Sequence, residues 1–122
     1  MQRVKVTQEE IKLNETLFLA IRLETKNANI ILLSEGEDNL GTLAVAIPQK
    51  EKMFGSPLSS ILLGDRNMII ARILAENLAQ KTGKLALASV FAKTMAEKDA
   101  GRIFFKLFEK TLGAKEGEGK KA

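Results

Sequence analysis

Residues 58–83, LSSILLGDRNMIIARILAENLAQKTG, contain the change in apolar spacing that decides the fold. The first six letters, LSSILL, predict a short strand. The letters GDRN then supply the chemistry of a strand-to-helix junction, in which Asp65 or Asn67 could cap a helix. The apolar residues that follow recur at helical spacing. We therefore expect a strand that leads directly into a helix, with Ile69 and Ile73 in the stripe that faces the core.

Strand patterns precede this stretch, and one more follows it. Residues 3–7 alternate between apolar and polar, and residues 16–23 place leucine and isoleucine on one face, which is typical of strands. The polar run 35–39 predicts a hairpin loop that joins two further strands. The predicted strands are 3–7, 16–23, 28–34, 41–47, 58–63 and 85–91.

A second helix is predicted near the end of the sequence. Thr94 and Glu97 have the spacing of a capping box, in which each side chain bonds the backbone amide of the other residue. Gly113 is a favourable residue to end this helix. We expect a single domain over residues 1–113, followed by a disordered polar tail over residues 114–122.

Strands first and helices late predict an α+β fold, an antiparallel β-sheet of about six strands with two α-helices on one face. The predicted strands are apolar on both faces, so an apolar surface remains opposite the helices. Monomers rarely expose such a surface, and we expect a second copy or a paralogue to cover it, sheet to sheet. In the alternative, both helices and the first strand wrap the sheet fully. The residues assigned to the dimer interface are Phe18, Ala20, Ala44 and Ala46.

The residue types that are missing restrict the chemistry, since the chain has no His, Cys, Trp or Tyr. Without cysteine there is no disulfide, no thiolate nucleophile and no zinc site of the usual Cys/His kind. Without histidine the commonest acid–base side chain is missing. The Gly-Lys pair at 83–84 lacks the other residues of a phosphate-binding loop. We expect no enzyme activity, no catalytic residue, no cofactor and no bound metal.

The chain carries a net charge of +4, which raises nucleic-acid binding as one alternative. A solvated Lys- and Glu-rich surface with a basic tail explains this charge more simply, and nucleic-acid surfaces usually add stacking aromatics. No apolar run approaches the roughly 20 residues that a membrane span needs, and the N-terminus lacks the pattern of a signal peptide. We expect a soluble, cytoplasmic protein with no membrane or nucleic-acid partner.

One loop stands apart, because Met53 and Phe54 lie within the otherwise charged segment 48–57. These two side chains either fold back over the core or present an anchor to a partner protein. They are the candidate partner-binding residues.

Taken together, the sequence resembles the proteasome assembly chaperones of types three and four, which in eukaryotes form the two halves of one heterodimer. The resemblance runs in order through residues 16–112. Some of its features are closer to type three and others to type four, which indicates a single archaeal-like protein that pairs with itself. The segments that carry it are LFL at 17–19, NLGTLAVA at 39–46, SILLGD at 60–65 and LAQKTGK at 78–84.

The resemblance implies an antiparallel sheet with two helices on one side and dimerisation through the opposite face. It also implies a non-enzymatic role, in which the protein binds a proteasome α-subunit, guides ring assembly and leaves as β-subunits arrive. Docking by a hydrophobic-Tyr-X tail, as in some other proteasome-binding proteins, is not expected, because the chain ends at Lys120-Lys121-Ala122. A roadblock-like dimeric scaffold is the main rival, although such modules usually place a helix before the first strands.

Overall fold

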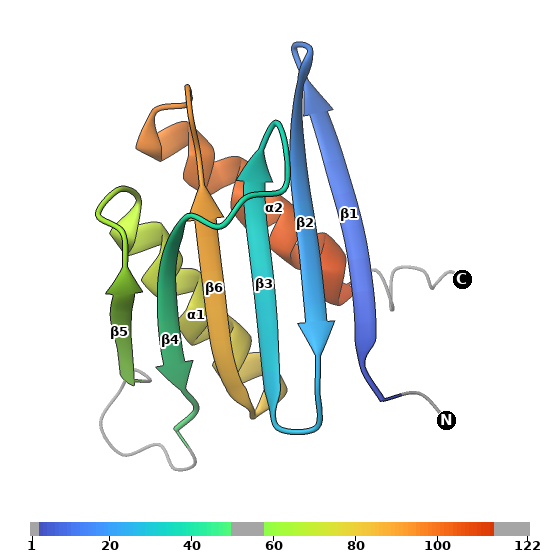
Figure 1. Cartoon of the computed structure of the whole chain (residues 1–122), viewed down its shortest axis with the longest axis vertical. Coiled ribbons are helices and arrows are strands. Elements are labelled where there is room, and N and C mark those ends of the chain that lie inside the picture. Colours follow the sequence, from blue (N-terminus) through green and yellow to red (C-terminus); the bar gives the residue numbers. More distant parts are fainter. Residues whose placement is uncertain (1–2, 50–57, 114–122) are drawn as a thin grey trace.

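Figure 1 shows the computed structural model of the chain, in which residues 3–49 and 58–113 are described. The predicted tail 114–122 therefore lies outside the described residues. Within these residues the chain forms an α+β fold of six strands and two helices. The elements are β1 (Lys5–Leu13), β2 (Thr16–Glu24), β3 (Ala28–Glu35), β4 (Thr42–Ile47), β5 (Leu58–Leu63), α1 (Met68–Thr82), β6 (Leu85–Phe91) and α2 (Glu97–Gly113).

The described strands form one mixed sheet in the order β1-β2-β3-β6-β4-β5. The prediction of a purely antiparallel sheet is therefore wrong, because β3 and β6 pair in parallel, with Ile31 opposite Ala88. The run 35–39 does not close a hairpin, since β6 lies between β3 and β4 and pairs with both. A parallel pair needs a crossover connection, and β4, β5 and α1 provide it.

The loop after β3 crosses over the ends of β3 and β6 to reach β4 (Figure 1). At this crossing Gly41 lies so close to β6 that a Cβ atom would be 2.1 Å from the carbonyl oxygen of Val90. The Gly41 amide also donates a hydrogen bond of 2.8 Å to Ser89 Oγ. A side chain at position 41 would force the loop away from β6, so this close approach requires glycine.

The first hairpin is longer than the sequence pattern predicts. β1 extends to Leu13, whereas the predicted strand covers only 3–7. Asn14 and Glu15 form the turn to β2, and both have positive φ angles, 50° and 71°. Two-residue turns of this kind suit a hairpin because their backbone twist matches that of the flanking strands.

Both helices lie on one face of the sheet (Figure 1), with α1 over β4, β5 and β6 and α2 over β1 and β2. Phe18 of β2 meets Phe104 of α2 edge to face, with ring centroids 6.0 Å apart. The packing beneath α1 uses small residues on both elements. These buried alanines are Ala44, Ala46, Ala86 and Ala88 in the sheet and Ala71, Ala75 and Ala79 in α1.

The assignment of Phe18, Ala20, Ala44 and Ala46 to a dimer interface is wrong. Each of these residues is at most 1 % exposed and belongs to the core beneath the helices. The reason is steric, since a helix approaches a sheet closely only where the strands carry small side chains, and Phe18 fills the space beside α2. The larger residues of the opposite parity are left on the other face.

The helix ends and the outer side of α1 also differ from expectation. Asn67 is the N-cap residue of α1 but makes no side-chain cap hydrogen bond. Thr94 does not cap α2, because its hydroxyl donates to Glu35 instead. Ile69 and Ile73, predicted to face the core, are 67 % and 39 % exposed. At Thr94 a tertiary contact, the hydrogen bond to Glu35, overrides the local pattern.

Candidate functional site on the open face of the sheet

The face of the sheet opposite α1 and α2, here called the open face, carries large apolar residues on neighbouring strands. Residues paired in register lie side by side on the same face, so the pairing identifies each row. One apolar row crosses β1, β2, β3, β6 and β4 through Val6, Leu23, Ile30, Leu87 and Val45. Other large apolar residues of this face are Leu19, Ile21, Leu32, Leu43, Ile47, Leu58, Leu63 and Leu85.

Water still reaches much of this face. In the centre, Ile30 and Leu87 are half-buried by their neighbours alone. Towards the edges Val6, Ile47 and Leu58 are 51 %, 53 % and 65 % exposed. Among the described elements, α1 and α2 both pack on the other side (Figure 1). Contiguous exposed apolar surfaces are uncommon on monomers and occur at interaction sites, which makes the open face the candidate site.

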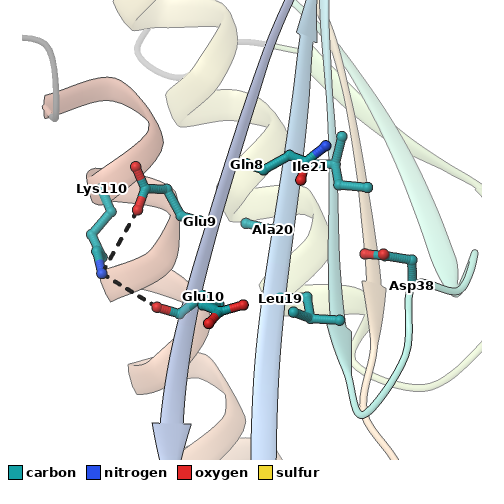
Figure 2. Close-up of a pocket in the computed structure, with 8 residues that line it drawn as sticks. All are labelled: Gln8, Glu9, Glu10, Leu19, Ala20, Ile21, Asp38 and Lys110. Carbon is teal, nitrogen blue, oxygen red and sulfur yellow. Dashed lines mark hydrogen bonds and ion pairs between the residues drawn. The ribbon is translucent and has the colours of Figure 1, made fainter.

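Polar groups border the open face at the β1 edge. Gln8 and Glu10 of β1 lie in register with Ile21 and Leu19 of β2. A shallow depression of about 390 Å³ lies here, and Asp38 from the loop after β3 faces it (Figure 2). An apolar floor with carboxylates at its margin has the anatomy of a protein interface, in which a polar rim surrounds an apolar centre.

The other side of β1 is fastened to α2. Lys110 of α2 forms an ion pair with Glu9 at 3.7 Å and donates a hydrogen bond of 3.3 Å to the carbonyl oxygen of Glu10. Figure 2 shows Lys110 and Glu9 on the helix side and Leu19 on the open side. These contacts hold the edge strand in place, so that its alternate side chains border the open face.

Two described carboxylates have clearly shifted pKa values, and both face the helix side of the sheet. Burial by itself raises the pKa of Glu35, but hydrogen bonds from the Thr94 hydroxyl and from the backbone amides of residues 93–95 outweigh burial and leave the pKa lowered. The hydrogen bond from Lys84, 3.0 Å away, lowers the pKa of Glu24. Both groups are thereby held ionised, and both join segments that are distant in sequence.

Met53 and Phe54 lie outside the described residues. Residues 3–49 and 58–113 contain no group of three or more side chains that could hold a metal ion. Over the same ranges, neither helix combines the length and the apolar character of a membrane span.

The strand patterns alone do not identify the open-face residues, because both alternating sets of residues along each strand are apolar. One signal could have identified them. Ala44, Ala46, Ala86 and Ala88 give β4 and β6 one small-residue face each, and α1 repeats alanine at 71, 75 and 79. Small residues on a helix and on a strand indicate where the two pack closely, which leaves the leucines and valines for the opposite face.

The fold belongs to a recognisable class, a mixed β-sheet with two helices on one face and an apolar opposite face, as seen in the described residues. A chain from the crystal structure of a novel chaperone complex for yeast 20S proteasome assembly has a similar arrangement of sheet and helices. The two superpose with a TM-score of 0.66 over 96 % of this chain and 98 % of that chain, at 13 % sequence identity. At such low identity the match establishes a shared fold. No protein-family model matches the sequence, and no curated protein matches it.

Proposed function

We propose that this chain is a non-enzymatic proteasome assembly chaperone. The observation that carries the proposal is the fold match, which spans 96 % of this chain and 98 % of a chain from the yeast assembly complex. The match therefore includes the sheet and both helices together. The sequence resemblance to chaperone types three and four supports the same conclusion from different evidence, namely short segments in shared order.

Two of the segments that carry this resemblance meet in space. Gly64, in SILLGD, has a φ of 92°, and a Cβ atom there would lie 2.5 Å from Thr42 Oγ1. Thr42 belongs to NLGTLAVA. The contact places the junction between β5 and α1 against the start of β4, where only glycine combines a positive φ with so close a neighbour. Both segments thus share one structural role, the close packing of this junction against the start of β4.

The proposed active form is a homodimer in which two open faces pack against each other. Closed two-fold symmetry is the commonest arrangement of identical chains, and two sheets can pack face to face about 10 Å apart with their side chains interdigitated. The apolar row through Leu23, Ile30 and Leu87 would lie near the centre of such an interface. A paralogue with an equally apolar face could take the place of the second copy.

The proposed client is a proteasome α-subunit, bound in the cytoplasm without cofactor or metal. The chaperone would hold the subunit during ring assembly and leave as β-subunits arrive. Release follows physically if the bound surface is accessible in the assembly intermediate but blocked in the finished particle, since the difference between the two affinities then sets the direction of the process.

A direct binding experiment tests this function. The full chain is immobilised and offered each purified α-subunit of the same organism, singly and as partial rings. We expect at least one α-subunit to be retained, and we expect β-subunits to release it. The fully assembled core particle is the control and should not be retained. If every α-subunit and every partial ring passes through unbound, the proposed function is wrong.

A further inference from the structure

Helix α1 carries a second, smaller apolar surface on the side that faces solvent. Met68, Ile69 and Ile73 are 41 %, 67 % and 39 % exposed, and we call these three residues the α1 patch. Ile69 and Ile73 are one helical turn apart and therefore lie on the same face. The buried side of the helix is separate and contains Ile70, Leu74 and Leu78. The α1 patch is thus an addition to the core stripe, at positions where a surface helix normally carries polar residues.

A depression of about 490 Å³ adjoins the patch at the first turns of α1 and α2. Met68 and Ile69 line it together with Met95 from the segment before α2. Its polar lining includes side chains of both charges, among them Arg66 and Glu97. An apolar centre with a charged margin is the usual anatomy of a protein docking site, and methionine adapts its shape to a partner's side chain.

The sizes of the two exposed apolar surfaces indicate different partners. A stable dimer buries roughly 20–30 residues on each chain. The open face offers residues from each described strand, whereas the α1 patch and Met95 supply only four apolar side chains. The α1 patch is therefore too small to hold a second copy permanently, but it suits a partner that binds and later leaves.

The two surfaces can also be occupied at the same time. α1 lies on the far side of the sheet from the open face (Figure 1), so a dimer formed through the open faces leaves both α1 patches directed outward. A client on α1 would then not compete with the second copy.

We propose that the α1 patch is the surface that docks the proteasome α-subunit. This inference rests on the proposed function and deepens it by naming the client-binding surface. The α-subunit would insert an apolar side chain into the depression between the helix ends, while the charges at the margin set its orientation. A few side chains that fill well-packed pockets near the centre of an interface carry most of its binding energy.

The test uses the full chain with Ile69→Glu and Ile73→Glu combined. Both side chains are exposed, so we expect the circular dichroism spectrum and the sedimentation behaviour to match the wild type. Affinity for the α-subunit that the wild type retains should fall about tenfold or more, because each carboxylate would be desolvated in the complex. The matched control is Leu13→Glu, at an exposed leucine on the distant β1 edge, and it should keep wild-type affinity.

A milder variant, Ile69→Ala with Ile73→Ala, keeps the test decisive if the glutamates disturb the fold, and it should still weaken binding measurably. Equal α-subunit binding by the wild type and by well-folded patch variants would overturn this inference while leaving the proposed function intact. A wild-type protein that binds no α-subunit at all would overturn both.

Discussion

At the scale of single residues, Glu35 shows how one carboxylate connects distant segments. It ends β3, is 3 % exposed, and accepts hydrogen bonds from the backbone amides of Lys93 and Thr94 at 2.7 and 3.1 Å. The Thr94 hydroxyl donates to the same side chain. Because these donors favour the ionised form, the pKa of Glu35 lies below its ordinary value. The carboxylate therefore positions the segment that leads into α2.

Glu35→Gln should destabilise the protein at pH 7 by about 1.5–3 kcal/mol, the range for hydrogen bonds to a charged group. A lowered folded-state pKa means that the ionised side chain stabilises the protein above its ordinary pKa, and that this contribution is lost as the pH falls through the lowered value. The difference from the wild type should therefore shrink as the pH falls below the ordinary glutamate pKa of about 4.3. Urea denaturation at pH values above and below this pKa measures it.

Glu37→Gln makes the same change two residues along, at an exposed position. It should alter the free energy of unfolding by less than about 0.5 kcal/mol. A Glu35→Gln variant as stable as this control at pH 7 would show that the carboxylate contributes nothing to the junction.

At the scale of elements, a buried arginine of the sheet holds the C-terminal end of α2 in place. Arg22 of β2 is 3 % exposed. Its guanidinium donates to Asn29 Oδ1 at 2.6 Å and to the carbonyl oxygen of Thr111 at 3.1 Å. Glu24 lies 3.6 Å from the same group. A cation near the last carbonyl groups of a helix interacts favourably with the helix dipole, so Arg22 fixes α2 against β2 and β3.

Arg22→Met should lower the free energy of unfolding by about 3 kcal/mol, because it removes two buried hydrogen bonds and leaves their acceptors desolvated. Hydrogen exchange should speed up more over residues 105–113 than in α1. Arg102→Met, at an exposed position on α2, is the control and should leave both measurements close to wild type. A uniform loss of protection across both helices would contradict the local role of Arg22.

The order of strand and helix patterns predicts the elements well, but it does not predict how β3 and β4 are joined. A polar run with Gly36 suits a tight hairpin, and the local chemistry is the same in a loop that crosses another strand. What excludes the hairpin is β6, some 50 residues further along, which pairs with both strands. The close approach of Gly41 to Val90 is a consequence of this crossing. The residues next to Gly41 in the sequence do not predict it.

At the scale of the whole molecule, the open face governs assembly, and Leu87 tests this role. Leu87 lies between Ile30 and Val45 in the apolar row. Leu87→Glu should leave the monomer folded, because the side chain retains access to water, but should weaken the dimer at least about tenfold, because the interface would bury an unpaired charge. Sedimentation equilibrium at low micromolar concentration measures the change.

Gln8→Glu, at the polar margin of the same face, is the matched control and should dimerise like the wild type. A wild-type chain that stays monomeric at tens of micromolar would contradict the proposal of a homodimer. The same result would leave the apolar row without a partner and would call for a different protein to cover it.

By itself, the sequence determines the number and order of the described elements, the α+β class and the presence of an apolar surface beyond what two helices can cover. These features follow from the spacing of residues within each segment and from the composition of the whole chain, and neither depends on which distant segments pack together. Only the tertiary structure decides which parity faces the helices, that β3 and β6 run parallel, and that Ile69 and Ile73 face solvent. Both faces of these strands are apolar, so the choice between them depends on how closely α1 and α2 can approach the sheet, and that depends on side chains brought together from distant parts of the chain.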